Sequence, residues 1–131
     1  MITALVLTAA LMFTPPSIDT RNIPDSLYKG TAYYMPKKEK IRKCIIYRES
    51  RGNYRSDGPG GAGAYSFIQT TWDLYAPRAG YPHLVGVRPS KVKKFIQDAV
   101  FWRTWDRGNG KWHWSTRWNP GMLSCFEEKK R

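Results

Sequence analysis

The sequence is short of acidic residues, histidine and cysteine, and it has no long apolar run. Its 131 residues include 10 Asp and Glu, 2 His and 2 Cys. Neither His83 nor His113 has the His-x3-5-His or Cys-x-x-Cys spacing of zinc ligands, so we expect no metal site. The longest apolar run, residues 1–13, is shorter than the roughly 18 residues of a membrane-spanning helix, so we expect no membrane span.

Positive charge and aromatic residues are abundant instead. The net charge is +12, 41% of residues are hydrophobic and 15% are aromatic. This length and composition predict one folded domain and exclude a disordered chain. The charge indicates a polyanionic partner, and nucleic acid, an anionic membrane surface and acidic wall polymers all fit it.

The composition divides the chain into three segments. Residues 1–20 contain an apolar run with the length of a secretory signal core, so we expect export; a buried or partner-docking segment is the alternative. Residues 21–36 are predicted to be a linker or irregular arm. Residues 37–131 are the predicted domain. In an exported protein Cys44 and Cys125 should form a disulfide, worth about 4.5 kcal/mol from the loop it closes, and two buried free thiols are the alternative.

Apolar spacing predicts three helices in this domain. The first covers residues 37–50, and the second covers residues 72–75, capped by a threonine and stopped by Pro77. The third begins with Ser90 as its N-cap and ends before Gly108. The glycine-rich stretch after the first helix is predicted to be a loop beside a groove.

Glu49 is the candidate catalytic residue. It lies at the end of the first helix, one turn after Ile45 and Ile46, and has no Lys or Arg partner within that helix. Burial beside the apolar stripe and the negative end of the helix dipole both favour the protonated carboxyl that a general acid needs. A structural carboxylate paired with Arg51 or Arg55 is the alternative.

Two motifs resemble those of a known superfamily. Residues 49–53, ESRGN, look like the E-S-x-x-N signature of lytic transglycosylases, goose-type lysozymes and resuscitation-promoting factors. Residues 63–69, GAYSFIQ, look like their downstream G-A-x-G-L-x-Q segment. Residues 67–72, FIQTTW, are close to the F-x-Q-S-T-W of the resuscitation-promoting factors. The resemblance covers about residues 40–125.

The resemblance implies a mostly α (α+β) fold, a lysozyme-like helical domain with a small irregular β or loop region beside a saccharide groove. It implies that Glu49 is the catalytic acid/base and that Gln69 lines the groove near the scissile sugar. Ser50 and Asn53 match supporting positions. Ser66 replaces the glycine of the family and is expected to border the substrate.

Aromatic residues near Gln69 are candidate platforms for sugar rings. Tyr65 and Trp72 flank this residue and are the preferred candidates. Core packing is the preferred interpretation for at least half of the full candidate set, which also contains Tyr75, Trp112, Trp114 and Trp118.

Asp57 is the candidate second carboxylate, since it is the other acidic residue between Glu49 and Trp72. Glycosidases normally use two carboxylates. A turn-forming Asp is the alternative in this glycine-rich loop. In the transglycosylase chemistry that the resemblance implies, one Glu protonates the leaving oxygen and then deprotonates the 6-hydroxyl of the sugar, closing a 1,6-anhydro ring without metal or cofactor.

The resemblance therefore implies an enzyme that cleaves the glycan strand of peptidoglycan between N-acetylmuramic acid and N-acetylglucosamine. A hydrolytic lysozyme and a noncatalytic wall-binding module of a virion or secretion apparatus are the alternatives. We expect a monomer that acts on glycan strands and the anionic wall, without nucleic acid as partner. Its expected place is outside the cytoplasm, or on the virion if the source is a bacteriophage.

Overall fold

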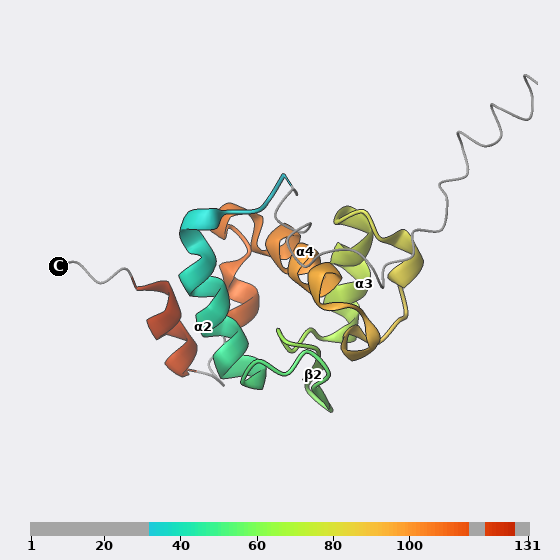
Figure 1. Cartoon of the computed structure of the whole chain (residues 1–131), viewed down its shortest axis with the longest axis horizontal. Helices are drawn as coiled ribbons and strands as arrows, with labels where there is room; N and C mark the ends of the chain where they lie inside the picture. Colours follow the sequence, from blue (N-terminus) through green and yellow to red (C-terminus); the bar gives the residue numbers. More distant parts are fainter. Residues whose placement is uncertain (1–31, 116–119, 128–131) are drawn as a thin grey trace, which may run out of the picture.

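The computed structural model describes residues 32–115 and 120–127. Most of the predicted N-terminal segments and one candidate platform, Trp118, lie outside the described residues. The fold is mostly α with one small sheet, as predicted (Figure 1). The elements are η3 (Pro36–Lys38), α2 (Glu39–Ser50), β1 (Asp57–Gly58), β2 (Gly61–Ala62), α3 (Gln69–Arg78), η4 (Pro82–Leu84), η5 (Pro89–Lys91), α4 (Lys94–Trp105), η6 (Asp106–Gly108), η7 (Lys111–Trp114) and η8 (Pro120–Phe126), where η marks a 3₁₀ helix.

Helix α2 confirms the first predicted helix and begins two residues later than expected, after the 3₁₀ turn at Pro36. It ends because Arg51 adopts the left-handed conformation, with φ of 54°. The backbone N–H of Arg51 then donates to the carbonyl of Tyr47 at 3.0 Å, and that of Gly52 donates to the carbonyl of Ile46 at 3.4 Å. These bonds satisfy carbonyls that the helix end would leave free. Glu49 is thereby placed in the last turn.

Helix α3 is longer than the predicted second helix, which was wrong at both ends. It begins at Gln69, after Ile68 in extended conformation, so the two threonines lie inside the helix and do not cap it. Pro77 also lies inside, in the last turn. Proline removes one N–H donor, and in the last turn this costs one helical bond and leaves the preceding turns intact.

Helix α4 corresponds to the third predicted helix, but the predicted start at Ser90 was wrong. Ser90 is not its N-cap but lies in η5, and the extended backbone of Val92 separates η5 from α4. Lys93 precedes the first helical residue. Helix α4 lies in the middle of the described domain (Figure 1), and ten of its twelve residues are buried.

The core consists mainly of aromatic rings around α4. Phe101 stacks on Tyr65 with ring centroids 4.5 Å apart, and Trp114 lies 4.9 Å from Phe101. Phe67 contacts Trp72 edge to face at 5.4 Å. Such pairs add to the free energy gained by burying apolar area. The core therefore includes side chains from the segment between the small sheet and α3.

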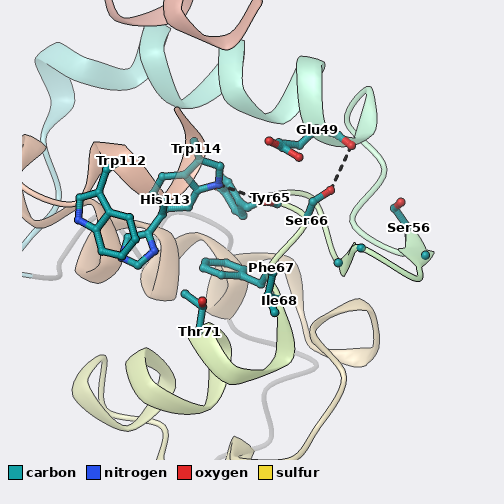
Figure 2. A pocket seen from close by; sticks show the side chains of 13 residues that line it. Glu49, Ser56, Tyr65, Ser66, Phe67, Ile68, Thr71, Trp112, His113 and Trp114 are labelled. Carbon is teal, nitrogen blue, oxygen red and sulfur yellow. Dashed lines mark hydrogen bonds between the residues drawn. The ribbon is translucent and has the colours of Figure 1, made fainter. Parts of the chain in front are cut away.

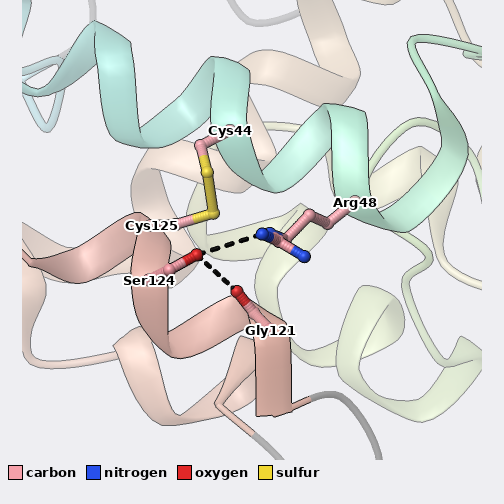
Figure 3. Close-up of a disulfide and its surroundings, with 5 residues drawn as sticks. All are labelled: Cys44, Arg48, Gly121, Ser124 and Cys125. Atoms are coloured by element: carbon pink, nitrogen blue, oxygen red, sulfur yellow. Dashed lines mark hydrogen bonds between the residues drawn. A yellow bond between two sulfur atoms is a disulfide. The ribbon is translucent and has the colours of Figure 1, made fainter.

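The predicted disulfide is confirmed: Cys44 of α2 is bonded to Cys125 of η8 (Figure 3). Next to it, Arg48 donates to the Ser124 hydroxyl at 3.1 Å, and that hydroxyl donates to the carbonyl of Gly121 at 2.7 Å. Covalent and polar contacts thus hold η8 against the helix that carries Glu49. Within the described part of the chain, no helix has the length and apolar character needed to cross a membrane.

Candidate active site

A pocket of about 660 Å³ opens between the end of α2, the β1–β2 hairpin, the start of α3 and η7. Figure 2 shows Glu49 approaching it from α2, Ile68 and Thr71 from the α3 side, and Trp112 from η7. Its lining residues are Glu49, Ser56, Gly58, Gly60, Gly61, Tyr65, Ser66, Phe67, Ile68, Thr71, Trp112, His113 and Trp114.

Glu49 is the one acidic side chain among the described residues that line this pocket. It is half-buried. Burial raises the pKa of its carboxyl, while the nearby Ser66 hydroxyl lowers it, and the net direction is upward. Within the part of the chain that the structure describes, Glu49 forms no ion pair, and the Arg51 guanidinium lies instead over the Tyr47 ring at 5.7 Å. Burial without a cationic partner thus favours the protonated form of this carboxyl.

Ser50 and Asn53 lie beside Glu49 without lining the pocket. The Ser50 hydroxyl donates to the carbonyl of Ala64 at 2.8 Å and so joins the end of α2 to the segment after the hairpin. The exposed Asn53 side chain accepts the N–H of Arg55 at 3.0 Å, which stabilises the turn after the helix. Both residues are positioned to support the backbone around the pocket.

Asp57 is not brought to the pocket. Its carboxylate is exposed in β1 and accepts two hydrogen bonds from Arg88, at 2.7 and 3.1 Å. The same guanidinium donates to the carbonyl of Gly58 at 2.9 Å. This pairing gives Asp57 a structural role in holding the hairpin.

The structure does not place Gln69 and Trp72 in the pocket. The Gln69 amide donates to the Asp73 carboxylate at 3.0 Å and to the carbonyl of Val87 at 3.1 Å. Trp72 is fully buried, and its indole N–H donates to the carbonyl of Leu84 at 3.0 Å. Both side chains fasten α3 to the loop that follows it, so the expectation of a sugar platform at Trp72 is wrong.

Tyr65 borders the pocket, but its ring is inside the core. The residue has 0% exposure, and its hydroxyl donates to Asp98. The backbone carbonyl of Tyr65 accepts the indole N–H of Trp114 at 3.1 Å. A fully buried ring has no free face for a sugar, so the predicted platform at Tyr65 is also wrong.

Trp112 and Ile68 supply the exposed apolar surface of the pocket instead. Trp112 is 63% exposed and Ile68 59% exposed. The Trp112 ring stacks on His113 with centroids 3.7 Å apart, and His113 lies 3.3 Å from the Tyr75 hydroxyl. Burial lowers the pKa of His113, which keeps its ring neutral near pH 7. The Trp-His-Trp run made Trp112 a candidate, but its sequence did not distinguish it from the buried tryptophans.

No cluster of three or more His, Cys, Asp and Glu able to hold a metal ion occurs in the described ranges 32–115 and 120–127. The pocket lining is instead the carboxyl of Glu49, the imidazole of His113, glycine backbone, apolar and aromatic side chains, and the aliphatic hydroxyls of Ser56, Ser66 and Thr71. Burial raises the pKa of the Glu49 carboxyl and lowers that of the His113 imidazole, so burial favours the uncharged form of both groups.

Comparison with known proteins finds relatives that are named transglycosylases. The chain is 42% identical over 76 residues to proteins named probable transglycosylase SceD from Staphylococcus aureus strains Newman, Mu3 and USA300. The similarity covers 56% of this chain and 31% of each relative, so the chain spans about a third of the length of these curated relatives. No family model matches the chain, and no solved structure matches it.

Proposed function

We propose that this protein cleaves the glycan strand of peptidoglycan, with Glu49 as its single catalytic acid/base. The observation that carries the proposal is the half-buried carboxyl of Glu49, which stands alone among the acidic side chains of the described pocket lining. The similarity to proteins named transglycosylases supports the same class of reaction.

The proposed reaction is intramolecular transglycosylation between N-acetylmuramic acid and N-acetylglucosamine. The protonated carboxyl of Glu49 donates its proton to the glycosidic oxygen, and the bond from that oxygen to C1 of the muramic acid breaks. The resulting carboxylate accepts the proton of the 6-hydroxyl of the same sugar, whose oxygen bonds to C1. The products are a 1,6-anhydro end and a free hydroxyl on the leaving sugar, and Glu49 is protonated again.

The position of Asp57 favours this route over two-carboxylate hydrolysis. Glycosidases that activate water or form a glycosyl-enzyme intermediate need a second carboxylate facing the first across the sugar. Asp57 lies outside the pocket and is paired with Arg88. The single-carboxyl reaction needs no such partner.

Substrate binding is assigned to the exposed surface around Glu49. Trp112 offers an indole face for a sugar ring, and the glycines of the hairpin allow the polar backbone to approach the strand closely. Ser66 completes the lining beside the carboxyl. The charge of +12 favours accumulation on anionic wall polymers, and the disulfide suits an extracytoplasmic location.

Mass spectrometry of fragments released from purified peptidoglycan tests this function. Anhydro ends support transglycosylation, reducing ends indicate a lysozyme, and no release indicates a noncatalytic wall-binding module. Glu49→Gln should lower release at least a hundredfold, because the amide cannot donate the required proton. Asp57→Asn is the matched control and should retain most activity; equal loss in both variants contradicts the single-carboxyl mechanism.

A further inference from the structure

Ser66 adopts a backbone conformation that serine normally avoids. Its φ is 50°, in the left-handed region that favours glycine. The other described non-glycine residues with positive φ are Arg51, Asp106 and Arg107, which lie where helices α2 and α4 end. Ser66 instead lies in the wall of the pocket. Residues with a strained backbone are often found at functional sites, which makes the side chain of Ser66 a candidate for a role in this pocket.

The surrounding chain fixes the backbone of Ser66. Ala62 and Phe67 exchange two backbone hydrogen bonds, of 3.0 and 2.9 Å, across an isolated bridge. The N–H of Ser66 donates to the carbonyl of Gly63 at 3.2 Å. Gly61 lies so close that a Cβ there would collide with the carbonyl of Ser66. These contacts all involve backbone atoms of Ser66 or its neighbours, so a glycine at position 66 could make them with less strain.

The Ser66 side chain is directed at the residue that carries the proposed chemistry. Its hydroxyl donates to the backbone carbonyl of Glu49 at 3.2 Å (Figure 2). This bond joins the last turn of α2 to the segment that follows the hairpin. Together with the bond from the Ser50 hydroxyl to the carbonyl of Ala64, it ties the end of α2 to this segment at two points.

We propose that Ser66 is a positioning residue for Glu49: its hydroxyl, held by the left-handed backbone, fixes the helix end so that the Glu49 carboxyl stays directed into the pocket. A role for Ser66 in catalysis rests on the proposed function. Its effect on the Glu49 carboxyl can be measured whether or not the protein cleaves peptidoglycan.

A donor beside a carboxyl favours its ionised form. The Ser66 hydroxyl, which donates to the backbone carbonyl of Glu49, also lowers the pKa of the nearby carboxyl, against the larger effect of burial, which raises it. The other charged or titratable groups around the pocket are engaged elsewhere, as Arg48 contacts Ser124, Arg51 the Tyr47 ring, Asp57 Arg88, His113 Tyr75, and Tyr65 Asp98. Loss of the Ser66 hydroxyl should therefore raise the pKa of Glu49 further.

Two variants separate the hydroxyl from the backbone. Ser66→Gly removes the hydroxyl and relieves the strain, while Ser66→Ala removes the hydroxyl and keeps the Cβ in the left-handed conformation. Carbon-13 NMR titration of the Glu side-chain carboxyls measures the result directly, with the Glu49 signal assigned by its loss in Glu49→Gln. Thermal unfolding of the same proteins measures the strain, and Ser66→Gly should be the more stable variant.

We expect both variants to raise the Glu49 pKa by about half a unit, as loss of a polar hydroxyl near the carboxyl would do. An unchanged pKa in both overturns the inference, and so does a shift in Ser66→Gly alone, which would assign the effect to the backbone. The alkaline limb of any cleavage activity should move upward in parallel. A wild-type protein that releases no fragments would refute the proposed function, while the titration would still decide the role of Ser66.

Discussion

A Cβ on Gly63 would collide with the side-chain oxygen of Gln97. That oxygen accepts the N–H of Ala64 at 2.9 Å, and the Gln97 amide donates to the carbonyls of Tyr54 and Val92 at 3.0 and 2.8 Å. Gln97 is fully buried in α4. One side chain of the central helix therefore holds both ends of the segment that contains the hairpin wall of the pocket.

Gly63→Ala should destabilise the protein more than an alanine at another left-handed glycine. Both Gly63 and Gly80 have positive φ, of 78° and 100°, but a Cβ at Gly80 meets nothing within 4 Å. Gly80→Ala should cost about 1 kcal/mol from the backbone alone, and Gly63→Ala about 2 kcal/mol more, because Gln97 must also move. Urea unfolding measures the free energy of unfolding of both variants. Equal losses would show that the Gln97 side chain can move away from the new Cβ without destabilising the protein.

Asp98→Asn should cost about 2 kcal/mol of stability. The Asp98 carboxylate lies in the core and accepts the Tyr54 hydroxyl at 2.7 Å, the Tyr65 hydroxyl, and Arg42 at 3.4 Å. Removing its charge weakens the compensation of the buried guanidinium, although Glu39 still pairs with Arg42 at 2.9 Å.

Asp57→Asn is the control for that measurement, since it makes the same change in an exposed ion pair with Arg88. Its expected cost is below about 1 kcal/mol. Chemical denaturation of the two variants side by side should rank them clearly. A smaller loss for Asp98→Asn than for Asp57→Asn would show that the buried network contributes little.

Reduction of the disulfide should remove about 4 kcal/mol of unfolding free energy. Cys44 and Cys125 are separated by 81 residues, and opening so long a loop returns considerable entropy to the unfolded chain. Urea unfolding with and without reductant measures the loss. The Cys44→Ser, Cys125→Ser double variant should unfold at the same urea concentration as the reduced protein, with or without reductant. If reduction leaves the urea midpoint of the wild-type protein unchanged, the disulfide does not provide this stabilisation.

Glu49→Gln should raise the melting temperature at pH 7. Burial raises the pKa of the Glu49 carboxyl in the folded protein, so the protonated form contributes stability that is present at low pH and lost as pH rises through the folded-state pKa. The amide avoids this loss. The difference between variant and wild type should therefore disappear below the ordinary pKa of Glu, about 4.3.

Glu39→Gln should change the melting temperature in the opposite direction at neutral pH. Glu39 accepts two hydrogen bonds of 2.9 Å from Arg42, so the amide should lower the melting temperature. Scanning calorimetry at pH 4 and pH 7 measures both variants. If Glu49→Gln were the less stable protein at pH 7, the Glu49 carboxylate would have a stabilising partner that this pocket does not provide.

Trp112→Ala should weaken the binding of peptidoglycan oligosaccharides about tenfold, the loss expected for one aromatic stacking contact. Because Trp112 is 63% exposed, the fold should lose little stability. Tyr47→Ala is the matched control, since Tyr47 is 62% exposed on α2 and does not line the pocket. Calorimetric titration with a chitin oligosaccharide separates the two, and equal affinities would remove Trp112 from the substrate site.

The position of Glu49 could be predicted from the sequence because it depends on local structure. The apolar spacing of one helix and the turn after it place the carboxyl at the helix end. The disulfide was likewise predictable, because the chain offers a single pair of cysteines. Both predictions required no knowledge of how distant elements pack.

The groove residues could not be predicted in this way, because neighbours in sequence face different directions. Tyr65 and Ser66 are adjacent, yet the ring enters the core and the hydroxyl enters the pocket, since the left-handed backbone of Ser66 redirects the chain. Gln97 and Asp98 were overlooked because a search for apolar periodicity passes over polar residues, and their burial depends on partners more than 30 residues away. The exposure of Trp112 likewise follows from tertiary packing of η7.

Helix α2 is restrained at several points. Its Cys44 and Arg48 side chains are bonded to η8, and hydrogen bonds of the Ser50 and Ser66 hydroxyls hold its C-terminal end. Glu49 is therefore carried by a helix end that covalent and polar contacts tie to two other segments of the chain. A glycan strand is a linear chain of sugars, so a protein that cuts it at one linkage must align that linkage with the group that donates the proton. In the proposed reaction, the restrained end of α2 would make the Glu49 carboxyl the reference point against which the scissile linkage is aligned.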